Sequence, residues 1–224
     1  MDIIIDIETL GTRPGCEIIE IGAVAVGPNG KIGDEFDTSV STRTTLSYVE
    51  RVAAGAVPCT DGDRAETCRW WTGDAERRET LAAIMDEGVF CLRETLEFFG
   101  AWLGNPSDDI RIWANGPSFD IAILEHAYRE CGIPRPWKCT QERCVRTALD
   151  LGGYVRGSIQ WEEDGPRHRA LLDARHEARK LLSVGAIGAG GFIARREREQ
   201  IIAGLVSRGT ISGAEADRML GKGA

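Results

Sequence analysis

Long apolar runs are missing from this 224-residue sequence, and no stretch approaches the roughly 20 residues that a membrane-spanning helix needs. No basic segment precedes an apolar one at the start, so we expect no secretion signal, a cytoplasmic location and no membrane partner. The seven cysteines include no C-x-x-C pair, which is typical of reduced thiols. A zinc site on Cys139 and Cys144 is disfavoured, because their spacing matches no common zinc module.

An excess of basic residues is also missing: 27 Lys and Arg stand against 35 Asp and Glu, a net charge of −8. This balance argues against a protein that holds nucleic acid by bulk electrostatics. It does not exclude an enzyme that handles one end of a strand, because acidic clusters bind divalent cations and a bound metal reverses the local charge. The length predicts one sizeable domain with an appendage.

Residues 1–11 read M-D-I-I-I-D-I-E-T-L-G and predict the β-strand around which the chain is organised. Isoleucines at positions 3, 5 and 7 alternate with Ile4, Asp6 and Glu8, the period of two of a strand. Asp6 and Glu8 therefore leave the same face as neighbours, where two carboxylates repel each other unless a cation lies between them. The alternative is an edge strand that exposes two solvated acids, although Asp is disfavoured in strands.

Further elements follow from periodicity and turn residues. Strands are expected at 18–26 and 31–40, completing an antiparallel meander, and at 109–114. Helices are expected at 47–54, 76–85, 91–103, from Ser118 as N-cap to about Cys131, at 141–151 and at 169–182. A Gly-rich linker at 183–191 and short helices at 192–205 and 212–220 predict a division into a domain at 1–182 and an extension at 183–224.

The stretch 41–73 is otherwise irregular and contains the pair Trp70 and Trp71. Adjacent tryptophans point in different directions on any regular element. One interpretation places one or both in the core, and the other makes them a platform on which a base stacks.

Three polar residues lie where such residues are unusual. Asp120 falls in the first turn of its helix, where the helix dipole favours a carboxylate, at the head of a core-facing stripe. Asp173 borders the apolar side of the helix at 169–182, and His168 lies five positions earlier. The alternative for His168 is a solvated loop histidine.

Three motifs resemble those of the DEDDh group of 3′→5′ exonucleases, which have a ribonuclease H-like fold. D-I-E-T at 6–9 resembles the first motif, N-G-P-S-F-D at 115–120 the second, and H-R-A-L-L-D-A at 168–174 the third. Their order and spacing agree with the group over residues 1 to about 182. Within the group, the chain is most similar to the phage-type exonucleases and related bacterial exoribonucleases, which also carry a W-W pair after the third strand.

The resemblance implies an α/β ribonuclease H-like mixed sheet, with an antiparallel three-strand meander plus parallel strands flanked by helices. It implies a metal-dependent exonuclease that releases 5′ mononucleotides from the 3′ end of single-stranded DNA or RNA. The catalytic set would be Asp6, Glu8, Asp120, His168 and Asp173. The four acids would hold two Mg²⁺ or Mn²⁺ ions, and His168 would remove a proton from the attacking water.

By the same resemblance, the backbone of Thr9 and Leu10 and the residues Asn115 and Phe119 would contact the terminal nucleotide, with Trp70 as the stacking partner. Two positions depart from the pattern. Many relatives have an acid at the position of Leu172, and several have an acid at the position of Cys144. Both lie outside the catalytic five, so they bear on substrate contacts. The tyrosine-type variant is excluded, because no Tyr lies near Asp173.

Other functions stay open beside this interpretation. The chain could act as a proofreading or processing subunit with a polymerase, docked through its C-terminal helices, or as a non-catalytic nucleic-acid-binding protein on the same fold. A homodimer also stays open, since dimers are common in the family. A choice between DNA and RNA depends on a few contacts to the 2′-hydroxyl, which a sequence does not place.

Overall fold

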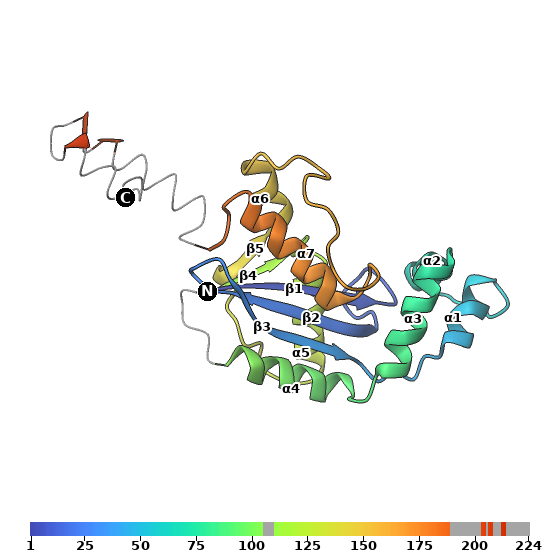
Figure 1. The fold of residues 1–224 in the computed structure, drawn as a ribbon. Coiled ribbons are helices and arrows are strands. Elements are labelled where there is room, and N and C mark those ends of the chain that lie inside the picture. The colour runs from blue at the N-terminus through green and yellow to red at the C-terminus, as the bar shows by residue number, and fades with distance from the viewer. Residues whose placement is uncertain (105–109, 189–202, 205, 208–211, 214–224) are drawn as a thin grey trace.

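A five-stranded sheet forms the centre of the computed structural model, which describes residues 1–104, 110–188, 203–204, 206–207 and 212–213 (Figure 1). Its strands are β1 (Asp2–Thr9), β2 (Ile18–Val26), β3 (Ile32–Ser39), β4 (Arg111–Ala114) and β5 (Glu142–Cys144). They lie in the order β3-β2-β1-β4-β5, antiparallel from β3 to β1 and parallel from β1 to β5. The predicted α/β architecture of a meander plus parallel strands is confirmed.

β1 lies in the middle of this sheet and is covered on both faces (Figure 1). Ile3, Ile5 and Ile7 pack in one core cluster with residues of α4 (Leu92–Leu103) and α5 (Asp120–Glu130). Ile4 packs on the other face with α6 (Val145–Leu151) and α7 (Ala170–Ser183). The predicted alternation is confirmed, and the alternative of an exposed edge strand is wrong, because β1 has a paired strand on each side.

Three helices form a separate group beside the end of the sheet: α1 (Leu46–Ala53), α2 (Gly62–Trp71) and α3 (Ala75–Glu87) (Figure 1). Their buried residues pack around Leu10, which directly follows the end of β1. This packing places α2 against the strand end that carries Asp6 and Glu8.

The helix α2 corrects the expectation of an irregular segment between 41 and 73, in which one helix was predicted. The Asp61 side chain caps α2 by accepting hydrogen bonds from the backbone N–H groups of Asp63 and Arg64. Only Cys68 and Trp71 of the helix are buried. A helix is recognised in a sequence by a stripe of apolar residues at helical spacing, and α2 lacks this stripe because so few of its residues are buried.

Two further boundaries differ from prediction. α5 begins at Asp120 with Phe119 at the N-cap, and Ser118, the predicted cap, lies in the turn before it. The helix predicted at 141–151 is instead a short 3₁₀ turn at 139–141, the strand β5 and then α6. β5 has only three residues and exists through its parallel pairing with β4, a long-range contact that local periodicity does not contain.

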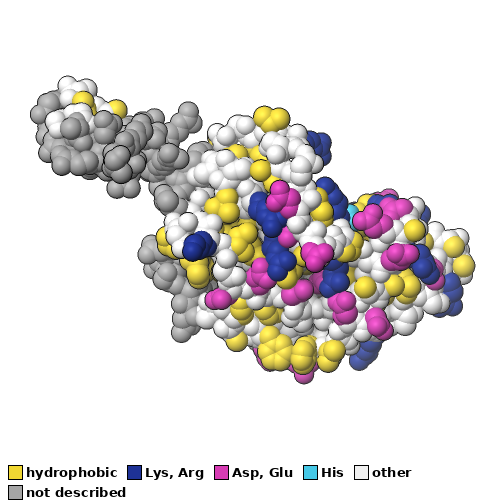
Figure 2. All heavy atoms as spheres, viewed as in Figure 1, with side chains coloured by type: hydrophobic (Ala, Val, Ile, Leu, Met, Phe, Trp, Pro, Cys, Tyr) yellow, Lys and Arg dark blue, Asp and Glu magenta, His cyan; other side chains and the backbone are white. Residues whose placement is uncertain are grey.

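Ion pairs cover the outward side of α7, where Figure 2 shows basic and acidic side chains next to one another. Arg175 pairs with Glu35 of β3, and Arg169 pairs with Glu87 of α3. Among the described residues, every helix is too short or too polar to cross a membrane. The predicted helices at 192–205 and 212–220 lie almost wholly outside the described residues, and the division at 182 stays a prediction.

Candidate active site

Two carboxylates leave β1 at the point where its neighbour β4 has ended. β4 pairs with residues 2–5 of β1, so residues 6–9 extend beyond it. Asp6 lies opposite Gly22 of β2, and Glu8 lies opposite Glu20. Directly opposed residues share a face of the sheet, so both acids are on the side that α7 covers. Glu8 is only 9% exposed, which removes most of the water that would otherwise screen it.

Asp120 reaches the strand edge that β4 leaves free. It begins α5 and is 3% exposed. Backbone hydrogen bonds from Ile7 and from Asp120 itself stabilise its carboxylate. The backbones of β1 and of the first turn of α5 therefore each supply a donor to this buried acid.

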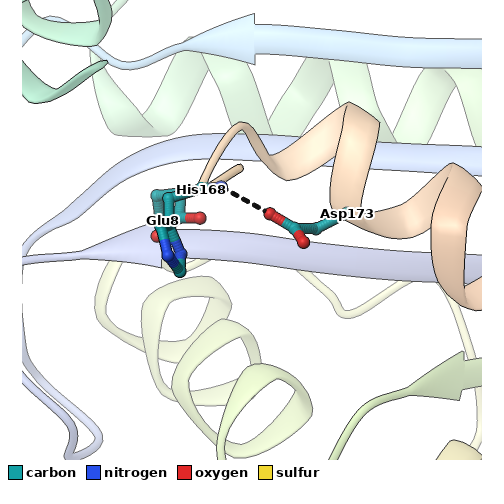
Figure 3. A group of neighbouring side chains, drawn as sticks. All are labelled: Glu8, His168 and Asp173. Carbon is teal, nitrogen blue, oxygen red and sulfur yellow. Dashed lines mark hydrogen bonds between the residues drawn. The ribbon is translucent and has the colours of Figure 1, made fainter. Parts of the chain in front are cut away.

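The start of α7 brings two residues together: Asp173 lies in the first turn of the helix, and His168 lies two residues before it (Figure 3). The backbone N–H of His168 donates a hydrogen bond of 2.7 Å to the Asp173 carboxylate. His168 has a φ of 65°, a left-handed conformation that is uncommon for a residue with a side chain. Because Asp173 satisfies the N–H ahead of the helix, the strained backbone of His168 is held in one position.

The start of α7 is itself anchored on β2 by Glu20, which is fully buried. Glu20 accepts a 2.7 Å hydrogen bond from the backbone N–H of Ala170 and a 2.8 Å bond from Nε of Arg169. Burial raises the pKa of Glu20 to about 7, although these hydrogen bonds oppose the shift. No prediction from the sequence included Glu20. The feature that could have indicated it is that Glu20 is the lone acid in the otherwise apolar strand β2.

Three of the five predicted catalytic groups meet closely. A ring nitrogen of His168 and carboxylate oxygens of Glu8 and Asp173 lie within 4.8 Å of one another (Figure 3). The negative charge of Asp120 raises the pKa of both Asp6 and Glu8, so Asp120 lies near them. The structure therefore brings all five residues to one end of β1, although they come from three separate segments of the chain.

The carboxylates destabilise one another in this arrangement. Burial raises the pKa of Asp6 well above its ordinary value, and the neighbouring carboxylates of Asp120, Glu8 and Asp173 raise it further. Burial likewise raises the pKa of Glu8, with Asp173 as the largest charge contribution. The pKa of Asp120 is raised to about 7 by burial. A group of acids that resists ionisation together is one that a divalent cation would stabilise.

His168 is held in a form that can accept a proton. Burial lowers the pKa of His168, and the charges of Arg77 and Arg167 add to this effect, while Asp173 opposes it. Its ring meets the ring of Trp70 edge-on, with the centroids 4.8 Å apart. A neutral imidazole near neutral pH suits the role of a general base.

A cavity of about 610 Å³, here called the active-site cavity, opens beside these groups. Its lining includes the predicted substrate contacts Thr9, Trp70, Asn115 and Phe119. The side chain of Leu10 is 1% exposed in the core around α1–α3, and the predicted contact through the Leu10 backbone stays a prediction. Asp63 of α2 lines the cavity and holds Thr12 by two hydrogen bonds, and no signal in the sequence pointed to it.

The two adjacent tryptophans have different environments. Trp71 is 1% exposed, and its Nε1 donates a 2.9 Å hydrogen bond to the carbonyl oxygen of Thr9. Trp70 is 40% exposed, lines the active-site cavity and lies under the guanidinium of Arg77, 4.5 Å from the ring centroid. Trp71 is therefore a core residue that supports the strand end, and Trp70 presents an accessible aromatic surface.

Replacing Trp70 by Ala should raise KM about tenfold, since base stacking on an aromatic ring contributes about 1–3 kcal/mol. Trp71→Ala is the matched variant and should lower the free energy of unfolding by about 3–5 kcal/mol, as expected for a large core residue. Urea unfolding and steady-state kinetics on one oligonucleotide measure both. A large stability loss for Trp70→Ala with unchanged KM would contradict the stacking role.

Comparisons with known proteins agree with this geometry. The chain is 26% identical over 170 residues to an exodeoxyribonuclease of Enterobacteria phage T4, covering 69% of this chain and 73% of that protein. The nuclease domain of 3′hExo, a DEDDh family member bound to rAMP, has a TM-score of 0.50 and 16% identity, covering 83% of this chain and 90% of that chain. E. coli exonuclease I in complex with an oligonucleotide has a TM-score of 0.54 and 12% identity. The match covers 88% of this chain and 43% of that chain.

The two solved structures confirm the predicted ribonuclease H-like fold. A family model described as the 3′-5′ exoribonuclease Rv2179c-like domain matches residues 1–184, which include all three motifs. The chain therefore belongs to the Rv2179c-like 3′-5′ exoribonuclease domain family and is a 3′-5′ exonuclease.

Proposed function

We propose that the protein removes 5′ mononucleotides one at a time from the 3′ end of a single strand, with Asp6, Glu8, Asp120, His168 and Asp173 as its catalytic residues. The observation that carries this proposal is the convergence of Glu8, His168 and Asp173 within 4.8 Å beside a cavity that Asp6 also lines. The exodeoxyribonuclease of phage T4 and the Rv2179c-like exoribonuclease domain support nucleic acid as the substrate.

The four acids would hold two divalent cations, Mg²⁺ or Mn²⁺. The set fits such ions because carboxylate oxygens are the ligands that hard cations prefer. The raised pKa values of Asp6 and Glu8 also support the proposal, since a cation would relieve the repulsion that contributes to them. When bound, the ions would activate the attacking water and neutralise the charge that develops on the leaving 3′ oxygen.

The chain's own residues would divide the remaining work. A ring nitrogen of His168 would take the proton from the attacking water, and the bond from its backbone N–H to Asp173 keeps the ring in place. Trp70 would stack on the terminal base, while Asn115 and Phe119 would line its position in the active-site cavity. The protein would thereby orient the last phosphodiester toward the acids.

The test uses single strands of RNA and DNA of matched sequence, each with a free or a blocked 3′ end. We expect Mg²⁺-dependent release of 5′ mononucleotides from free ends only. Whichever of the RNA and DNA strands is hydrolysed faster identifies the preferred substrate. Cleavage within blocked strands, or no release under any divalent cation, would contradict the proposal. Asp6→Asn serves as the inactive control for contaminating nucleases.

Replacing His168 by Ala should lower kcat by about 10²–10⁴, the usual contribution of a general base. Binding of Mg²⁺ should survive, because the four acids remain. Single-turnover hydrolysis and calorimetric titration with Mg²⁺ measure the two effects. Unchanged turnover would remove His168 from its role. His126→Ala is a matched control, since His126 lies on α5 and does not line the active-site cavity.

A further inference from the structure

A second cavity of about 670 Å³ lies next to the active-site cavity, among α6, α7 and the segment 152–167. Asn115, at the end of β4, lines both cavities. Arg167 lines the second cavity and directly precedes His168, which lines the first. A molecule that extends out of the active-site cavity therefore meets this second space within one residue of the catalytic histidine.

Cations dominate the lining of this second cavity, here called the arginine cavity. They are Arg146 of α6, Arg156 and Arg167 of the connecting segment, and Lys180 of α7. The acids of the lining are Asp150 and Glu177, of which Glu177 is paired with Lys180 at 2.8 Å. A local excess of positive charge in a protein whose net charge is −8 marks this place as different from the rest of the surface.

The three arginines have no carboxylate within ion-pair distance in the part of the chain that the structure describes. Arg146 donates a hydrogen bond of 3.3 Å from Nε to Oδ1 of Asn115. Arg167 lies over the ring of Trp161, 5.0 Å from its centroid. The charge of Arg146 acts on Asp120 and that of Arg167 on Asp173, so these two arginines lie near the acids of the active-site cavity. A guanidinium presents two parallel donors that match phosphate oxygens.

The floor of the arginine cavity is polar as well. His176 and Glu177 are 5% and 7% exposed, and Nδ1 of His176 and Oε2 of Glu177 have no hydrogen-bond partner among the described residues. Buried polar atoms are normally paired, so the unpaired Nδ1 of His176 in this lining points to a polar occupant. An imidazole N–H can donate to a phosphate oxygen, whereas Oε2 of Glu177 can only accept hydrogen bonds and does not favour an anion. The groups of this lining that favour an anion are therefore the arginines and His176.

We propose that the arginine cavity binds backbone phosphates of the same strand, on the 5′ side of the nucleotides that occupy the active-site cavity. This inference rests on the proposed function and names a second part of its substrate site. A phosphodiester chain offers an anion at each nucleotide, which fits several arginines spaced along one wall. The cavity would thus favour strands longer than a dinucleotide.

The experiment compares kcat/KM for a dinucleotide with that for a dodecanucleotide of the same composition, in the wild type and in Arg156→Glu and Arg146→Ala. Arg156 is exposed and has no ion pair among the described residues, so its replacement should leave the fold intact. We expect the ratio of the two kcat/KM values to fall about tenfold in Arg156→Glu, as expected for loss of a phosphate contact. Arg51→Glu, an exposed position on α1, is the matched control and should keep the wild-type ratio.

Salt dependence and product inhibition provide the deciding outcomes. The slope of log KM against log salt for the dodecanucleotide should decrease by about 0.7 for each phosphate contact removed. If both variants keep the wild-type ratio and slope, the inference is overturned although the nuclease is active. If the variants weaken only inhibition by a free 5′ mononucleotide, the cavity holds free product and the inference is also overturned. If the wild type hydrolyses neither substrate, the proposed function fails first.

Discussion

Replacing Asp6 by Asn should abolish hydrolysis and at the same time stabilise the metal-free protein. Asp6 is a half-buried carboxylate among other carboxylates, so its charge destabilises the folded state when no cation is bound. Removing that charge should raise the free energy of unfolding of the metal-free protein, because the repulsion and desolvation that raise the pKa of Asp6 also destabilise its ionised form. The same change removes one of the four proposed metal ligands, so binding of Mg²⁺ should weaken and activity should disappear.

The pH dependence of stability provides a second measure of the same effect. Acids whose folded pKa is raised bind more protons in the folded state, so they make the metal-free protein less stable as pH rises. For Asp120 this window runs from about its ordinary value of 3.8 to about 7. The stability gain of Asp6→Asn over the wild type should therefore grow as pH rises from acidic to neutral.

Urea unfolding with a chelator, repeated with Mg²⁺, measures these quantities. Mg²⁺ should raise the midpoint of the wild type strongly and that of Asp6→Asn little, since ligand binding to the folded state stabilises it. Asp34→Asn is the matched control, because Asp34 is exposed on β3. Near-normal hydrolysis by Asp6→Asn, or equal stabilisation of both proteins by Mg²⁺, would remove Asp6 from the site.

Replacing Gly22 by Ala should also have a large effect, although Gly22 has no side chain and no predicted role. A Cβ at this position would lie 2.1 Å from the backbone nitrogen of Leu171 and 2.2 Å from the carbonyl carbon of Ala170. These are backbone atoms at the start of α7, so the clash is relieved only if the helix moves. The first turn of this helix carries Asp173, and His168 lies two residues before the helix, so a movement of α7 would displace both from Glu8.

We expect Gly22→Ala to lower the free energy of unfolding by about 1–3 kcal/mol, the usual cost of overpacking. Activity should fall by about 10² or more, because a displacement near 1 Å at reacting groups has that effect. Gly33→Ala is a matched control within a strand, since its Cβ would meet only the Ala25 carbonyl oxygen at 3.7 Å. If Gly22→Ala kept both its stability and its kcat, α7 could not be packed as closely on β2 as the structure has it.

Much of the candidate site was readable from the chain alone. The alternation in residues 2–9 determines that Asp6 and Glu8 share a face, because the strand period is a local property. The three motifs identified the remaining acids and His168, and the family match over residues 1–184 agrees with them. The sequence placed Asp120 at the beginning of a helix. It assigned the N-cap to Ser118, whereas the structure has Phe119 at that position.

Other features became visible only in three dimensions, since each depends on contacts between distant segments. The strand β5 forms through its pairing with β4, and α2 is held by its packing on Leu10 and its neighbours. The different roles of Trp70 and Trp71 follow from which indole meets the carbonyl of Thr9. No pattern within α6 or the segment 152–167 indicates that their arginines share one cavity.

By itself, the sequence determined the family, the central strand and the identity of the five proposed catalytic side chains, because motifs and periodicity are encoded locally. The tertiary structure decided how these side chains approach one another: β1 extends past β4, Gly22 admits the start of α7, and Glu20 anchors it. The physical reason is that ordinary carboxylates gain unusual properties only from burial and from neighbours far away in the chain.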